Sequence, residues 1–323
     1  MGLDLIIRRQ AMTNPYIDTI DMLLRNTLTS FRDNETTNMP TPYMFQNKTA
    51  LESIYLPNAV GAIPNYAFDG CTSLEEVDLH DATSVGNYAF RNCSSLTEVD
   101  LHSATSIGTD AFRNCTSLDG CDFSNVQTIG GGGFWNASLK NCLINPVSVG
   151  NNGMRDVKNC TIRFFERLSS IGGYGLILGG FQAGEPIVLP SLTSFTGTYA
   201  MSYSNYSIVD IGPFLETLAR TCFYNDGNLT TLILRRSSTI VALADNGSAF
   251  TNTRFASGGT GGTIYIPKVL YDELGTGSSL DYKAATNWST IDGYGTITWA
   301  QIEGSQYENY YADGTPIPEV EEE

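Results

Sequence analysis

Histidine, basic residues and long apolar runs are scarce in this chain. Only two of its 323 residues are histidine, and 18 lysines and arginines stand against 34 acidic residues, for a net charge of −16. Binding to nucleic acid needs clustered positive charge, and so does binding to an anionic membrane surface. We therefore expect neither partner. No apolar run approaches the ~18–20 residues of a membrane-spanning helix, so the sequence predicts no membrane span.

Motifs for catalysis and metal binding are also missing. The seven cysteines include no Cys-x-x-Cys pair, and the glycine clusters lack the lysine of a phosphate-binding loop. No segment matches a nucleophile elbow. A glycosidase needs paired carboxylates in a cleft. The flat β-sheet that we predict below could supply the pairs but not the cleft. We therefore predict a protein without enzymatic activity, cofactor or bound metal.

What the chain does have is a repeat of 22 residues between Tyr66 and Gly131. Each copy opens with Ala-Phe and continues with a cysteine and then a leucine at intervals of three residues; the copies are Phe68, Cys71, Leu74, then Phe90, Cys93, Leu96, then Phe112, Cys115, Leu118. So short a unit cannot close a globule, but it can form one turn of a solenoid. We therefore predict an α/β repeat solenoid in which equivalent residues stack roughly 4.8 Å apart, with the cysteines as an inward column.

The strand of each repeat carries polar residues on its outer side. Alternation along residues 76–80 sends Val77 and Leu79 inward and their neighbours outward. Stacking then lines up one exposed set, which we call the polar ladder: Glu76, Asp78, His80, Glu98, Asp100, His102 and Asp122. Carboxylates ~5 Å apart repel by ~1 kcal/mol in water, so the ladder could attract a cation. A solvent-screened surface, a weak cation site and a ligand-contact face remain alternative interpretations, and we take the ladder as the candidate binding site.

The segment before the repeats has helical periodicity. Asn14-Pro15 is typical of a helix start, and Ile17, Ile20, Leu24 and Phe31 follow at spacings of 3, 4 and 7. This pattern predicts an amphipathic helix from Asn14 to about Phe31. Its apolar face either caps the open end of the solenoid or docks on a partner protein or a second copy of the chain.

Three regions follow from these patterns. Residues 1–40 form a helical docking or capping segment, 41–267 the solenoid, and 268–323 a small C-terminal cap with an acidic tail. Within the cap, Val269–Leu274 and Tyr282–Trp288 are expected to be short helices, and Ile297–Ile302 an edge strand.

The repeat resembles the BspA-like leucine-rich repeats. The order Ala-Phe, x-x-Cys, x-x-Leu, x-x-Val-x-Leu matches that family from Ala67 to Ile129 and decays between Gly132 and Gly227. The resemblance implies one strand per turn on a shared parallel sheet, with short helical or irregular returns opposite. It also implies a role in adhesion or protein interaction, without naming site residues.

Flanking segments resemble repeat proteins of phages and prophages of gut bacteria; they are Met22–Thr29, Leu232–Arg235, Ile264–Pro267 and Tyr282–Ser289. This resemblance implies a virion-associated structural or adhesion protein of a bacteriophage. Its partners would be other virion proteins and a protein or glycan on the host surface. Arg8 and Arg9 follow the first apolar patch, whereas a signal peptide places its charges first, which is consistent with localisation to the virion. The alternative is a bacterial cell-surface or secreted adhesin of the same repeat family.

Overall fold

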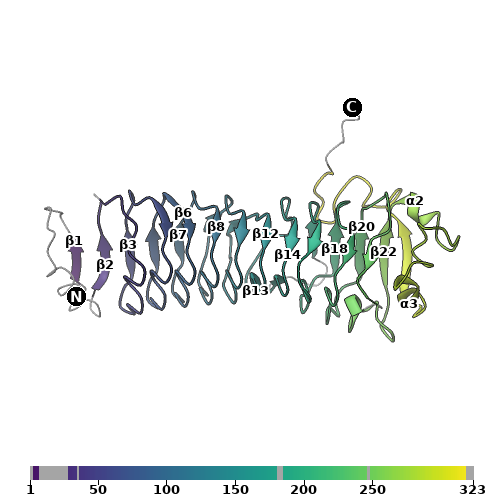
Figure 1. Ribbon diagram of the computed structural model, residues 1–323, viewed down its shortest axis with the longest axis horizontal. Coiled ribbons are helices and arrows are strands. Elements are labelled where there is room, and N and C mark those ends of the chain that lie inside the picture. The colour runs from purple at the N-terminus through teal and green to yellow at the C-terminus, as the bar shows by residue number, and fades with distance from the viewer. Residues whose placement is uncertain (1–2, 7–27, 35, 180–184, 246–247, 318–323) are drawn as a thin grey trace, which may run out of the picture. The chain divides into compact units, whose positions relative to one another are not determined.

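The computed structural model describes residues 3–6, 28–34, 36–179, 185–245 and 248–317. These residues form a parallel β-solenoid with very little helix, as Figure 1 shows. The fold expected from the repeat is therefore confirmed. The chain divides into two units, Met1–Thr161 and Ile162–Glu323, called here the N-terminal and C-terminal units. Within the described residues, no helix is both long enough and apolar enough to cross a membrane.

In the N-terminal unit, each turn contributes short parallel strands to the sheets. One sheet has the order β1 (Leu3–Ile6), β2 (Leu28–Arg32), β3 (Ser53–Tyr55), β5 (Glu76–Asp78) and β7 (Glu98–Asp100). A second contains β4 (Gly61–Ile63), β6 (Ala82–Val85), β8 (Ser106–Ile107), β10 (Thr128–Ile129) and β12 (Ser148–Val149). The strands β9 (Asp122–Phe123) and β11 (Leu143–Ile144) form a pair, and β13 (Met154–Val157) follows.

The register of these strands reproduces the sequence repeat. Val77 pairs with Val99 and Asp78 with Asp100, each one repeat apart. The repeat phenylalanines are fully buried and stack in a column from Phe45 to Phe134, with neighbouring ring centroids 5.4, 5.1, 5.1 and 5.2 Å apart. This column is the core of the unit, and its alignment confirms that the 22-residue repeat is one solenoid turn.

The repeat cysteines form a second inward column beside the phenylalanines. All three are buried, and their thiols donate hydrogen bonds to the carbonyls of Phe45, Phe68 and Phe90 at 2.9, 3.1 and 3.0 Å. Burial raises the pKa of Cys71 to about 12. The cysteines therefore act as small apolar residues that also satisfy a buried carbonyl of the preceding turn.

Asparagines allow the tight corner of each turn. Asn92, Asn114 and Asn136 have φ of 62°, 62° and 55°, a left-handed conformation that asparagine tolerates better than most residues. Their side chains also connect the turns, because Asn114 donates to Asn92 at 2.8 Å and Asn136 donates to Asn114 at 2.9 Å. The corner residues thus fix both the bend and the stacking.

The C-terminal unit repeats this architecture with longer strands. Its main parallel sheet has the order β16 (Pro186–Leu189), β18 (Ile208–Ile211), β20 (Thr231–Leu234), β22 (Gly262–Ile266) and β23 (Ile297–Gln301). The pairs β14 (Ser170–Ile171) with β17 (Ser194–Phe195) and β19 (Thr217–Leu218) with β21 (Ala242–Leu243) lie on other sides of the turns. The remaining elements are β15 (Leu176–Leu178), η1 (Ser248–Phe250), α2 (Lys268–Tyr271) and α3 (Trp288–Asp292).

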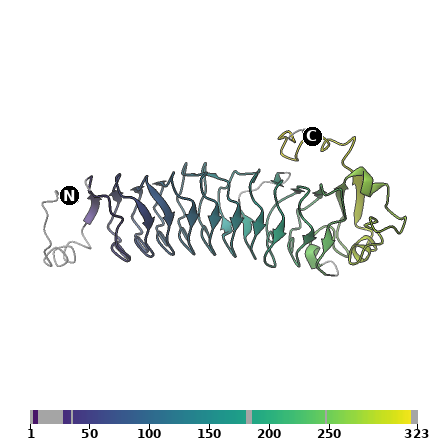
Figure 2. The same cartoon turned by 45° about the horizontal axis from the view of Figure 1, so that its top comes forward.

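The end of the C-terminal unit only partly matches the expected cap (Figure 2). Strand β23 does lie at the edge of its sheet, and a short helix, α2, lies near the expected position. The helix expected at 282–288 is wrong, because residues 282–287 form turns and α3 begins only at Trp288. Asn287 has φ of 69°, which interrupts a right-handed helix at that residue. Trp288 is fully buried, and its indole N–H donates to the Val241 carbonyl at 2.7 Å.

The predicted N-terminal helix needs a correction. Its last residues, Leu28 to Phe31, lie in β2, which pairs in parallel with β3. Pairing with β3 provides backbone partners for Ser30 and Phe31, and Leu28 is buried, so tertiary context overrides the local periodicity. The rest of the expected helix, residues 14–27, lies outside the described residues.

Candidate functional site

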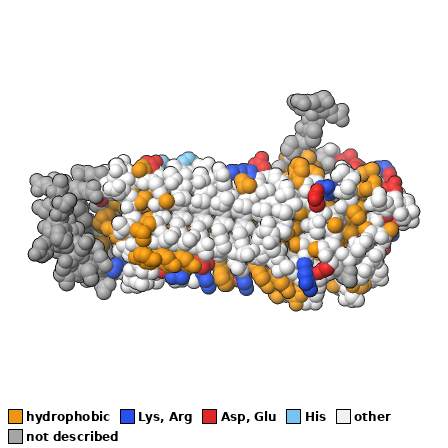
Figure 3. Space-filling model, viewed as in Figure 1, with side chains coloured by type: hydrophobic (Ala, Val, Ile, Leu, Met, Phe, Trp, Pro, Cys, Tyr) orange, Lys and Arg blue, Asp and Glu red, His pale blue; other side chains and the backbone are white. Residues whose placement is uncertain are grey.

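The polar ladder lies on one exposed face of the N-terminal unit. Strand pairing places Glu76 opposite Glu98 and Asp78 opposite Asp100. His80 and His102 extend the same rows, and their rings stack with centroids 6.2 Å apart. In Figure 3 the histidine colour, pale blue, appears near acidic side chains, red, at the upper edge of the view.

The histidines and aspartates of the ladder pair between neighbouring turns. His80 Nδ1 lies 2.8 Å from Asp100 Oδ2, and His102 Nδ1 lies 3.6 Å from Asp122 Oδ2. All four side chains are well exposed, with exposed fractions between 42% and 57%. The sequence pattern predicts that like residues stack on neighbouring turns, His80 on His102 and Asp78 on Asp100. The structure adds that each histidine reaches one turn along the solenoid to a carboxylate, which relieves the repulsion within the acidic rows.

These pairs change the proton affinity of the groups involved. The hydrogen bond to Asp100 and the charge of that carboxylate raise the pKa of His80 above its ordinary value. The pKa of Asp122 is lowered, first by the Ser124 hydroxyl and to a smaller extent by His102. The ladder therefore presents hydrogen-bond acceptors at neutral pH and gains positive charge as the pH falls.

The ladder offers charged and hydrogen-bonding groups to a partner. Its carboxylates and imidazoles lie on an exposed strand face, and the Ser124 hydroxyl beside Asp122 acts as a hydrogen-bond donor to that carboxylate. Within the described ranges, no three histidine, cysteine, aspartate or glutamate side chains are grouped so that they could hold a metal ion. What the ladder can do is accept hydrogen bonds and attract positive charge from a partner.

Of the four predicted docking residues, only Phe31 lies within the described residues. Ile17, Ile20 and Leu24 lie outside the described residues. Phe31 lies in β2, and its ring centroid is 5.3 Å from that of Phe45. Phe31 therefore packs against the first member of the phenylalanine column.

An aromatic edge of the N-terminal unit was not identified from the sequence. Tyr43, Tyr66 and Tyr88 stack with ring centroids 4.9 and 4.7 Å apart, and Tyr43 is 55% exposed. Each precedes the repeat phenylalanine by two residues, and this regular spacing was the available signal. The tyrosines cover one another's ring faces, so few faces remain for a flat ligand.

The same edge continues with a tryptophan between two arginines. The guanidinium carbons of Arg113 and Arg155 lie 4.0 and 5.0 Å from the Trp135 ring. Each guanidinium also has an acidic neighbour, Asp110 at 3.6 Å and Asp156 at 3.4 Å. The arginine charges are thus balanced by the neighbouring aspartates. The arginines form cation–π contacts with Trp135 that link neighbouring turns.

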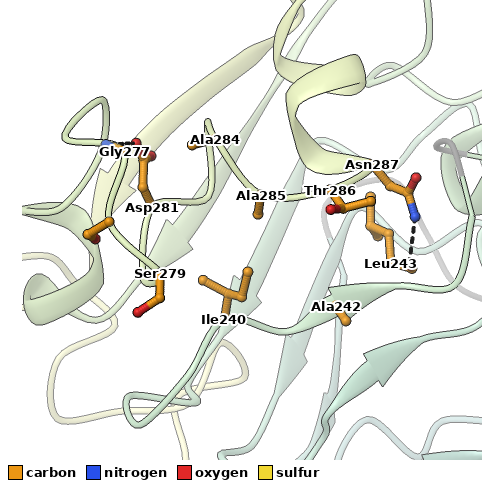
Figure 4. A pocket seen from close by; sticks show the side chains of 11 residues that line it. Ile240, Ala242, Leu243, Gly277, Ser279, Asp281, Ala284, Ala285, Thr286 and Asn287 are labelled. Carbon is orange, nitrogen blue, oxygen red and sulfur yellow. Dashed lines mark hydrogen bonds between the residues drawn. The ribbon is translucent and has the colours of Figure 1, made fainter.

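The C-terminal unit contains a shallow hollow of about 420 Å³ beside α3. In Figure 4, dashed lines join Asp281 to Gly277 and Asn287 to Leu243, so these two side chains bond the loops that form the hollow. Asp281 accepts hydrogen bonds from the backbone N–H groups of Gly277 and Lys283 at 2.8 and 2.9 Å, and Asn287 donates to the Leu243 carbonyl at 3.0 Å. These groups hold the loops in place, so the hollow has no convergent polar set for a small ligand.

Comparison with known proteins supports the repeat assignment. Residues 41–162 and 157–257 match the BspA type leucine rich repeat region, in six copies. Among solved structures, the chain is similar to a leucine rich cell surface protein from Faecalibacterium prausnitzii A2-165, with 15% identity, 90% of this chain and 93% of that chain covered, and a TM-score of 0.35. It is also similar to a leucine-rich repeat protein from Bacteroides ovatus ATCC 8483, with 15% identity, 85% and 84% covered, and a TM-score of 0.24. No curated protein matches the chain.

Proposed function

The chain belongs to the family of BspA-type leucine-rich repeat proteins, and from this premise we propose that it is a non-enzymatic protein that binds a partner protein through the polar ladder. Proteins of this repeat class generally bind other proteins. The observation that carries the proposal is a row of charged side chains on and directly after β5, β7 and β9, in which strand pairing fixes the spacing between β5 and β7 and ion pairs link His80 to Asp100 and His102 to Asp122. A rigid, periodic row of this kind suits an extended partner segment.

The charge of the ladder defines the partner more closely. It holds five carboxylates and two imidazoles, and two of the carboxylates are balanced only when the histidines are protonated. At neutral pH its net charge is therefore negative, which favours a segment rich in lysine or arginine and repels nucleic acid.

A binding assay with matched variants tests this proposal. The variant Asp100→Asn with Asp122→Asn removes two ladder charges. The control, Asp119→Asn with Asp156→Asn, removes two charges of similar exposure, 38% and 52%, elsewhere on the unit. Each exposed charge pair contributes up to ~1 kcal/mol at low salt, so the loss of two charges should weaken binding of a fluorescent decalysine peptide by up to about 30-fold. Equal loss in the control would refute the assignment, because only the net charge would then matter.

The pH dependence gives a second readout of the same site. Protonation of His80 adds positive charge beside the carboxylates, so affinity for decalysine should fall as the pH drops below the raised pKa of His80. In the ladder variant this fall should occur at lower pH, because Asp100 no longer raises the pKa of His80. A pH response unchanged by the two substitutions would place the binding site elsewhere.

We further propose that the protein is a virion component of a bacteriophage, with its N-terminal residues attached to other virion proteins or to a second copy. The support is the resemblance of its flanking segments to phage repeat proteins. Mass spectrometry of purified particles tests this placement, and absence from particles of a phage that encodes the chain would favour the cell-surface alternative. If particle association survives deletion of residues 1–38, those residues do not provide the attachment.

A further inference from the structure

The aspartate and histidine positions of the polar ladder have equivalents in the C-terminal unit, but there the equivalent side chains are buried. Asp210 on β18 occupies the position of Asp78, and Arg235 directly after β20 occupies the position of His80. In the N-terminal unit Asp78 is half-buried and His80 is exposed. In the C-terminal unit Asp210 and Ile233, its partner on β20, are fully buried, and the Arg235 side chain is 9% exposed.

The chain's own residues 302–317, called here the C-terminal segment, cover this face. Arg235 holds the Asp210 carboxylate with two hydrogen bonds of 2.7 Å. The same guanidinium donates to the carbonyls of Tyr307 and Tyr310, both at 3.0 Å. The backbone N–H of Ala312 donates to Asp210 at 2.8 Å. One ion pair on the face thus binds three backbone groups of the C-terminal segment.

Apolar contacts surround this polar centre. Ile233, Ile302 and Tyr307 form a buried cluster, and the rings of Tyr265 and Tyr307 meet edge to face with centroids 4.8 Å apart. Tyr311 lies 5.0 Å from the Arg235 guanidinium and contacts Phe164 at 5.4 Å. The C-terminal segment therefore holds the face mainly through two buried tyrosines, while Tyr310 is 50% exposed and contributes its carbonyl.

This contact resembles a protein–protein interface more than a hydrophobic core. Arginine and tyrosine are the residues that dominate binding at interfaces. The C-terminal segment also satisfies much of its own backbone, because Tyr311 N–H donates to Thr315 and Ile317 N–H donates to Asn309, at 2.8 and 3.1 Å. Burial raises the pKa of Asp210 despite the hydrogen bonds from Arg235, so covering the ion pair has a cost that exposure to water would remove. A cover of this kind can detach with its turns formed and leave a hydrated charge pair behind.

We propose that the outer face of β18, β20 and β22 is an interaction surface that the C-terminal segment masks in cis, and that it takes a partner loop of the same chemistry. Such a loop presents two tyrosines four residues apart, two backbone carbonyls that converge on Arg235, and one N–H for Asp210. The C-terminal segment and the partner loop then compete for one face. This inference rests on the C-terminal unit alone and does not depend on the polar ladder.

The test frees the face in the full-length chain. The variant Tyr307→Ala with Tyr311→Ala weakens the C-terminal segment and leaves every residue of the face unchanged. The probe is a fluorescein-labelled peptide of residues 302–317 with the native sequence. Hydrogen exchange should show the C-terminal segment of the variant released, and fluorescence anisotropy should show the peptide bound at least tenfold more tightly by the variant than by the native chain.

Three controls decide what the peptide recognises. Tyr310→Ala, which removes an exposed ring from the same segment, should behave like the native chain. A peptide with alanine in place of both buried tyrosines should not bind. Adding Arg235→Lys to the released variant should weaken binding of the native peptide at least tenfold, because lysine cannot form the forked contacts.

The proposal is overturned if the released variant does not bind the peptide, if the native chain binds it equally well, or if hydrogen exchange of residues 302–317 is unchanged by the tyrosine substitutions.

Should the double variant fail to fold, a protease site placed at Gly304 serves the same purpose. The chain is cut after folding, and the labelled peptide should replace the severed segment. Permanent retention of that segment against excess peptide would show a structural cap.

Discussion

Replacing Asp226 with cysteine should stabilise the C-terminal unit at neutral pH. Asp226 follows Phe223 by three residues, the interval at which Cys71, Cys93 and Cys115 follow their phenylalanines. It therefore occupies the cysteine column, and it is fully buried. Among the described residues, both of its carboxyl oxygens lack a hydrogen-bond partner. Burial raises the pKa of Asp226 well above its usual range.

The size and pH dependence of the effect follow from this burial. A buried polar group without a partner costs ~1–3 kcal/mol, and a charged one costs more. A thiol at this position avoids that cost, so Asp226→Cys should raise the free energy of unfolding by about 2 kcal/mol at pH 7, or Tm by about 5 °C. The pKa of Asp226 is raised by folding, so the native chain bears no ionisation penalty below the unfolded pKa of ~3.9. The penalty grows as the pH rises toward the folded pKa, and the advantage of the variant should grow with it.

Thermal unfolding followed by circular dichroism between pH 3 and pH 8 measures this difference. Asp226→Asn removes the charge but keeps a buried polar group without a partner. Comparing it with Asp226→Cys therefore separates the effect of the charge from the effect of the unpaired polar group. Glu216→Gln is the control, since Glu216 is 76% exposed and pairs with Arg236 at 3.4 Å, so its loss should change Tm little. A Tm difference for Asp226→Cys that is constant with pH would contradict the burial argument. A lower Tm at pH 7 would show that the carboxylate has an essential partner.

The remaining predictions concern the N-terminal unit. Phe90→Ala should lower the free energy of unfolding by about 3–5 kcal/mol, because it removes a fully buried ring between two stacked neighbours; chemical denaturation measures this. Cys93 should resist iodoacetamide in the native protein and react after unfolding, as read by mass spectrometry, because burial raises its thiol pKa well above the ordinary value. Asp100→Asn should lower the pKa of His80 in an NMR titration. In the native protein the paired, protonated His80 stabilises the fold below its unfolded pKa of ~6.5, and this contribution is lost as the pH rises through the raised folded pKa.

The sequence was most informative where one residue type recurs at one interval. The phenylalanine and cysteine columns and the pairing of Asp78 with Asp100 follow directly from the repeat, because stacked turns give equivalent residues equivalent surroundings. The same reasoning misled at residues 28–31. Leu28 and Phe31 fit a helical spacing as well as a strand, and only the adjacent β3 decides between them.

The polar contacts between turns were harder to foresee. Strand alternation placed His80 and Asp100 on the same face but did not indicate that one bonds the other across the turn. The tyrosine edge was not predicted, because Tyr43, Tyr66 and Tyr88 lie outside the inward positions that the repeat pattern defines.

Equivalent positions in the two units show why periodicity alone cannot identify a binding face. Asp78 and Asp210 have the same place in the strand, yet the residue that covers Asp210 comes from a segment about a hundred positions later that has no part in the repeat. Repetition determines which side chains point outward and how far apart they lie. Whether those side chains meet solvent, a partner or the chain's own end depends on residues outside the repeat. The face beneath the C-terminal segment is therefore the place where a change of conformation can alter what the solenoid presents, because no core residue of the turns has to move.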